Sequence, residues 1–258
     1  MRSAVLPIVT FALFAMVVAD RVSKALASTV DEASAGSPVR ADLESTAPAT
    51  VEAATSSGVR GTDRRIRLAL RQQLSREADR TYLDSMISRD SVIRRWPDRG
   101  GVPLKVSLVE GGPSDYHPRM GRFFLDALSR WENTGMGVRF DIVQDTLAAE
   151  IVVRWINNFP LDRAGQTDLT WDQAGRVRRA MITLAVRTTN GFRLPDEALL
   201  SVAAHEVGHA LGLPHSADSN DVMFSATQTS MLSPRDRRTA QVLYQLQPGP
   251  VRDPEGTQ

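Results

Sequence analysis

The sequence contains no cysteine, so the chain can form no disulfide bond and cannot use a thiol as a catalytic nucleophile. It also lacks an excess of charge of either sign, since 31 basic and 30 acidic residues leave a formal net charge of +1. This balance gives no indication of a nucleic acid or an acidic partner. With 42% hydrophobic residues among 258, the chain can bury one good core.

Long apolar runs are absent as well. The apolar stretch at residues 4–19 is sixteen residues long and contains Pro7, which makes it somewhat short for a membrane span. Arg2 precedes it and a small-x-small pattern at residues 25–27 follows it, so residues 1–27 are predicted to be a cleaved signal peptide. The alternative is an uncleaved signal anchor that tethers the chain to a membrane through residues 4–19. Both interpretations predict export to the periplasm, the cell surface or the medium.

Composition divides the remaining chain into segments. Residues 28–62 have no aromatic residue and are rich in Ala, Ser and Thr, which predicts a disordered linker. Residues 63–95 carry apolar residues at helical spacing among many arginines, and they are predicted to be a helical pro-region or stalk. An inhibitory or membrane-binding role for those arginines competes with a simpler interpretation, a solvated helix face. A Trp-Pro pair then marks a break, so residues 96–247 are predicted to form the main domain and residues 248–258 a tail.

The order of segments within residues 96–247 predicts an α+β fold. Strands are expected over residues 102–109, 138–143, 150–156, 165–171 and 176–186. Helices are expected over residues 116–132 with Ser114 or Asp115 as the cap, from Pro195 onward, and from Ser233 onward. A strand, helix, strand, strand order with short links indicates a mixed sheet with helices packed on it. The polar alternation at 165–171 is typical of an edge strand.

Histidine is scarce, yet three of the four histidines lie in one short segment, HEVGHALGLPHS. His205 and His209 are four residues apart, so on a helix their imidazoles project from one face and can hold one zinc ion. Gly212 favours the end of that helix, and the turn can bring His215 to the same metal. Glu206 lies beside the ligands, where it can act on metal-bound water. Three protein ligands leave the open position that a catalytic zinc requires.

A core helix with satisfied histidines is the simpler interpretation, but it leaves Glu206, the glycine and the third histidine unexplained. The segment resembles the zinc helix of the metzincins, a superfamily of zinc-dependent endopeptidases, and Ser216 after the third histidine is similar to the matrixin branch. The resemblance implies three zinc ligands, a general base and a Met-turn residue beneath the metal. In that order these are His205, His209 and His215, then Glu206, then Met223.

The resemblance covers roughly residues 100–247 and implies a metzincin-like zincin with a twisted five-stranded sheet, an active-site helix, a Met-turn and a C-terminal helix. Two features depart from relatives. No tyrosine occurs between Phe224 and Ser233, so the extra tyrosine ligand of the astacin-like and serralysin-like branches is absent. The lack of cysteine excludes the cysteine-switch latency of animal matrixins.

By the same resemblance, the edge strand binds the substrate backbone through β-augmentation. The residues expected to do so are Gly165, Gln166, Thr167, Asp168 and Leu169. The second, structural zinc of animal matrixins needs histidines that residues 118–204 do not contain, so a single catalytic zinc ion is expected. Whether a calcium ion also binds is left open. Asp162, Asp168 and Asp172 could be its ligands, although carboxylates in loops are more often only solvated.

The sequence therefore predicts an exported, monomeric zinc endopeptidase that hydrolyses internal bonds of protein or peptide substrates and has no nucleic acid partner. One alternative is a catalytically silent zinc-containing binding module at the cell surface, which the undamaged motif disfavours. A second alternative is a zinc hydrolase acting on a non-peptide bond, which the edge strand and the resemblance disfavour.

Overall fold

A computed structural model describes residues 65–84, 92–160 and 163–251 of the chain. The predicted signal at 1–27, the linker at 28–62 and most of the predicted tail lie outside these ranges. Among the described residues, none of the helices combines the length and the apolar character needed to cross a membrane.

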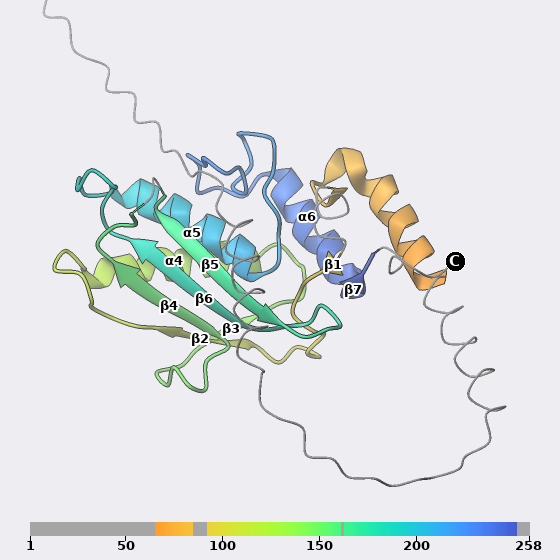
Figure 1. Cartoon of the computed structure of the whole chain (residues 1–258), viewed down its shortest axis with the longest axis horizontal. Coiled ribbons are helices and arrows are strands. Elements are labelled where there is room, and N and C mark those ends of the chain that lie inside the picture. The colour runs from red at the N-terminus through yellow and green to blue at the C-terminus, as the bar shows by residue number, and fades with distance from the viewer. Residues whose placement is uncertain (1–64, 85–91, 161–162, 252–258) are drawn as a thin grey trace, which may run out of the picture.

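The centre of the molecule is a five-stranded mixed sheet with the order β3-β2-β4-β6-β5 (Figure 1). Its strands are β2 (Leu104–Leu108), β3 (Phe140–Ile142), β4 (Ile151–Ile156), β5 (Gly165–Trp171) and β6 (Val177–Ala185). Four strands run parallel, and β5 pairs with β6 in the antiparallel direction. The predicted mixed sheet and the α+β, metzincin-like fold are confirmed.

Two helices cover one face of this sheet, namely α4 (Pro118–Glu132) and α5 (Asp196–Ala210) (Figure 1). Most residues of β4 and β6 are buried, as expected for strands in the interior of a sheet. By contrast β5, at the end of the sheet, buries none of its seven residues fully. The predicted interior and edge positions of these strands are therefore both confirmed.

The start of α4 differs from the prediction. Neither Ser114 nor Asp115 caps it; the cap is His117, whose Nδ1 accepts a hydrogen bond from the backbone nitrogen of Arg119. Pro118 favours the first helical position because its φ is already helical and it has no N–H to satisfy. The carboxylate of Asp115 instead accepts hydrogen bonds from Arg187 and Arg193, so it is not available to the helix.

The C-terminal helix α6 (Pro234–Gln245) begins as predicted, with a capping box between Ser233 and Asp236. Beside it lies the N-terminal segment, which is helical over residues 65–77 and continues in η1 (Ala78–Arg80) (Figure 1). A small second sheet pairs β1 (Val92–Ile93) with β7 (Gly249–Pro250). The chain therefore brings segments from both ends of the described region together.

Contacts between this N-terminal segment and α6 are buried and specific. The hydrophobic cluster that contains the buried residues of α6 also contains four residues of this segment, Leu70, Leu74, Tyr82 and Leu83. The hydroxyl of Tyr82 donates a 2.9 Å hydrogen bond to Oδ1 of Asp236, and burial raises the pKa of Tyr82 so that the phenol stays protonated. Residues 65–84 thus share the core of the main domain, while the predicted boundary at residue 96 stays a prediction.

Two leucines of the N-terminal helix test this packing. Leu74 is 2% exposed and Leu68 is 51% exposed, although both lie on the same helix. Leu74→Ala should lower the free energy of unfolding of the full chain by about 2–5 kcal/mol, because it empties a filled site in the core. Leu68→Ala should change it by less than about 0.5 kcal/mol. Urea denaturation measures both, and equal effects would show that the helix does not pack on the domain.

Candidate metal centre

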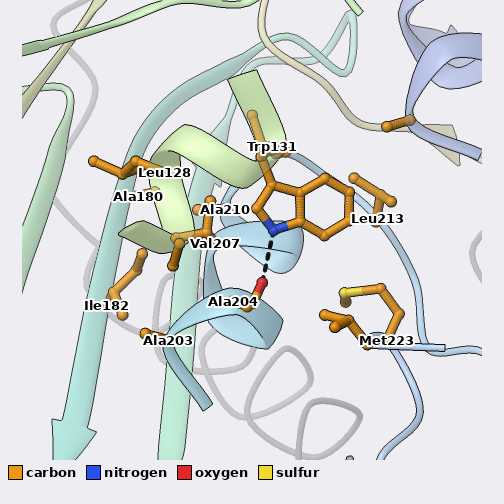
Figure 2. Packing of buried hydrophobic residues seen from close by; sticks show 14 of the residues in the cluster. Leu128, Trp131, Ala180, Ile182, Ala203, Ala204, Val207, Ala210, Leu213 and Met223 are labelled. Atoms are coloured by element: carbon orange, nitrogen blue, oxygen red, sulfur yellow. Dashed lines mark hydrogen bonds between the residues drawn. The ribbon is translucent and has the colours of Figure 1, made fainter. Parts of the chain in front are cut away.

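Helix α5 carries the histidine motif and is held in place by side chains from other segments. Nε1 of Trp131 donates a 2.7 Å hydrogen bond to the carbonyl of Ala204 (Figure 2), and Nε1 of Trp96 donates a 2.8 Å bond to the carbonyl of Ala210. Both indoles are fully buried, so each bond satisfies a donor that would otherwise be costly to bury.

Gly208 lies between the two helical histidines, where the close approach of neighbouring side chains requires glycine. A Cβ at this position would lie 2.2 Å from Sδ of Met223 and 2.9 Å from Cζ2 of Trp131. Met223 is therefore packed directly against the helix between its two histidines (Figure 2). The position of Met223 beneath a metal ion stays a prediction.

The helix ends as the sequence predicted. Gly212 has a φ of 95°, and its N–H donates to the carbonyl of His209 while the N–H of Leu213 donates to the carbonyl of Gly208. These two bonds form a Schellman motif. A Cβ on Gly212 would lie 2.2 Å from the carbonyl oxygen of Arg94, so both backbone conformation and space require glycine here.

A closed turn follows and leads the chain back beneath the helix. The N–H of Ser216 donates a 2.8 Å hydrogen bond to the carbonyl of Met223, and the hydroxyl of Ser216 donates to Asp221. The N–H of Val222 donates a 2.8 Å hydrogen bond to Oδ2 of Asp236, and Oδ1 of the same carboxylate accepts the hydrogen bond of Tyr82. The carbonyl of Val222 is thereby aimed at Nδ1 of His205, 2.8 Å away.

These elements bring the three predicted histidines together. Nε2 of His209 lies 3.0 Å from Nε2 of His205 and 3.1 Å from Nε2 of His215. Among the described residues this trio is the one group of histidine and carboxylate side chains whose ligand atoms converge closely enough to hold a metal ion. A tetrahedral zinc with Zn–N bonds of about 2.0–2.1 Å separates its nitrogen ligands by about 3.3 Å. The separations of the three Nε2 atoms are therefore close to those of nitrogen ligands on one zinc ion.

The protonation state of the histidines also suits the binding of a cation. Nδ1 of His205 faces the carbonyl of Val222 and Nδ1 of His209 faces that of Leu213, at 2.8 and 3.0 Å. A carbonyl can only accept, so each Nδ1 carries the proton and each Nε2 presents a lone pair. Burial lowers the pKa of both imidazoles, and the neighbouring histidines lower that of His205 further. Neutral rings with converging lone pairs are the donor set that a metal ion binds.

The family model of the matrixins matches residues 104–245, which include the five-stranded sheet and the whole of α4, α5 and α6. The chain belongs to the matrixin family. A search of curated proteins found no match to it. Membership implies a metalloprotease-type hydrolase that binds zinc, and the histidine trio is the group in this matrixin that could hold the ion.

The carboxyl of Glu206 lies beside the histidines of this matrixin in a nearly dry environment. Glu206 is 5% exposed, and burial raises the pKa of its carboxyl to about 7. A hydrogen bond from Thr167 and the charge of Arg163 act in the opposite direction, and Asp168 raises the pKa slightly. A cation bound by the histidines would also favour the ionised form.

The residues expected on the substrate strand all lie on β5. Within the described part of the chain, β5 pairs only with β6, so its other edge is available for a further strand. Gly165 and Thr167 face Glu206 on α5. Gln166 and Asp168 lie on the other face of the strand and are bonded to each other at 2.8 Å.

The calcium hypothesis has no support in the described residues. Oδ2 of Asp172 accepts from Arg176 at 2.8 Å and from Arg178 at 2.7 Å, and Oδ1 accepts from backbone N–H groups of the same turn. Asp168 is engaged by Gln166. Asp162 lies outside the described residues.

Two residues shape the centre through side-chain contacts that the sequence did not predict. Asp236 was recognised only as the start of a helix, yet its carboxylate also binds Val222 and Tyr82. Thr167 was named for its backbone, yet its side chain contacts Glu206. The alternation of side chains along β5 places Gly165, Thr167 and Leu169 on one face, and this could be predicted from the sequence. No sequence pattern indicates which residues of the fold that face contacts.

The four histidines allow a matched test of metal binding. His215→Ala should weaken zinc binding by more than about 100-fold, because it removes a direct ligand rather than a supporting contact. His117→Ala should leave zinc binding unchanged, since His117 caps α4 away from the trio. Competition with a chromophoric chelator measures both affinities. Equal zinc affinity in the two variants would refute the assignment of the site.

Proposed function

We propose that this matrixin is an exported zinc-dependent endopeptidase that hydrolyses internal peptide bonds of proteins. The observation that carries the proposal is the convergence of three histidine lone pairs beside the buried carboxyl of Glu206, under the open edge of β5. Export rests on the signal-like sequence of residues 1–27.

In this proposal His205, His209 and His215 hold a single zinc ion, which when bound polarises a substrate carbonyl and acidifies water. Glu206 takes a proton from the attacking water as its oxygen adds to the carbonyl carbon. Glu206 then gives that proton to the amide nitrogen as the C–N bond breaks. One water is consumed, and one carboxyl and one amine are released.

An extended peptide would add to β5 as a further strand. Its backbone would pair with residues Gly165–Leu169, since they form the part of the edge strand nearest Glu206. Pairing through the backbone fixes the register of the peptide without selecting its sequence. Met223 touches no substrate; it supports α5 through its contact with Gly208.

Glu206→Gln in the full chain tests the mechanism. The variant should lower the rate of casein cleavage by about 10²–10⁴-fold, because it removes the proton acceptor, while bound zinc stays at the level of the unsubstituted protein. Glu197→Gln, an exposed residue in the first turn of the same helix, is the matched control and should cleave normally.

Removal of zinc with a chelator should abolish cleavage, and added zinc should restore it. Two results would contradict the proposal. Undiminished cleavage by Glu206→Gln would exclude Glu206 as the base. A zinc-loaded chain that cleaves neither casein nor other unfolded proteins would indicate the catalytically silent binding module instead.

A further inference from the structure

The side chain of Thr167 makes a contact that the reaction described above does not use. Its hydroxyl lies 2.6 Å from Oε2 of Glu206 and 3.1 Å from the carbonyl oxygen of the same residue. A hydroxyl has one proton to donate, and the shorter distance and the charge of a carboxylate both favour Oε2. Thr167 therefore donates to the carboxyl that we propose as the general base.

Gly165 shapes the same environment from two residues away. A Cβ at position 165 would lie 2.4 Å from Oε1 and 2.6 Å from Cγ of Glu206, so any larger residue would displace the carboxyl. Because Gly165 and Thr167 lie on one face of β5, they act on the carboxyl together. Gly165 leaves room for the group, and Thr167 binds one of its oxygens.

The two carboxyl oxygens consequently differ. Oε2 is engaged by Thr167, whereas Oε1 accepts no hydrogen bond from any described residue. A glutamate side chain rotates about three bonds, and a base that must meet a water molecule loses effectiveness when its carboxyl samples several orientations. A donor fixed on a strand removes that freedom, and it leaves one oxygen for the water.

We propose that Thr167 is a positioning residue, whose hydroxyl holds the Glu206 carboxyl in the orientation for proton transfer. This inference rests on the proposed function. Thr167 is also part of the strand that would pair with the peptide. The same short segment would then both set the register of the substrate and hold the carboxyl of the base.

A purely structural role, tying β5 to α5, is the competing explanation, and three variants of the full chain separate the two. Thr167→Val keeps the shape and removes the hydroxyl, and Thr167→Ser restores the hydroxyl. Thr170→Val is the control, because Thr170 is exposed on the same strand and its hydroxyl lies 3.4 Å from the carbonyl of Arg179 on β6.

Kinetics on a quenched fluorescent peptide, copied from a casein site that the protein cleaves, give the first readout. Thr167→Val should lower kcat by about 10- to 100-fold, the loss expected for one hydrogen bond to a charged group, with KM changed less than about twofold. Thr167→Ser should keep kcat within about threefold of the unsubstituted protein. Zinc affinity should not differ among the variants.

A second readout uses metal-free protein and no substrate. The infrared band of the Glu206 carboxylate, identified by its loss in Glu206→Gln at alkaline pH, should shift in Thr167→Val and stay in place in Thr167→Ser and Thr170→Val. An unshifted band in Thr167→Val would overturn the hydrogen bond itself.

The kinetic outcomes distinguish the two proposals. Cleavage by the unsubstituted protein together with an unchanged kcat of Thr167→Val overturns the positioning role alone. So does an equal loss in Thr167→Ser, or a loss of kcat that is accompanied by weaker zinc binding and lower stability. Failure of the zinc-loaded unsubstituted protein to cleave any peptide overturns the proposed function, and the positioning role with it.

Discussion

The hydrogen bond from Nδ1 of His205 to the carbonyl of Val222 joins the two segments on which the centre depends. One is α5, which carries two histidines and the carboxyl; the other is the turn that returns the chain from His215 to Met223. The bond fixes the tautomer of His205 and, with it, the direction of the lone pair on Nε2. If the turn moved, both the third histidine and the orientation of the first would change together.

Packing around α5 follows from the same requirement. A helix that presents ligands to a metal must not rotate, and rotation is prevented on several sides by specific contacts rather than by apolar area alone. Two indole N–H groups bind its carbonyls, Met223 fills the notch at Gly208, and the Schellman turn at Gly212 fits against the carbonyl of Arg94. The two hydrogen bonds are directional and the two close contacts are steric, so together they oppose rotation of α5.

What the sequence predicted well are features whose cause is local. The cap at Ser233, the helix end at Gly212 and the four-residue spacing of His205 and His209 each depend on neighbours along the chain, and all three are found as expected. The edge position of β5 was also predictable, since strand polarity reports exposure directly.

Features that depend on distant partners could not be predicted. Asp115 had the composition of a helix cap, but arginines 72 and 78 residues further along the chain recruit its carboxylate, and His117 caps the helix instead. Tyr82 and Asp236 are 154 residues apart, and no periodicity links them. The contact between Thr167 and Glu206 requires knowing how the strand is placed against the helix, which is a property of the tertiary fold.

The Tyr82–Asp236 hydrogen bond has a consequence for how far the chain could be shortened from its N-terminal side. Asp236 uses its other oxygen to hold Val222, and Val222 holds His205, so residues 65–84 are connected to the metal site through three hydrogen bonds in series. Proteolytic trimming that stops before residue 65 leaves this connection intact. Trimming that also discards residues 65–84 would deprive Asp236 of its phenol donor, so any shortened form that keeps this support must retain Tyr82.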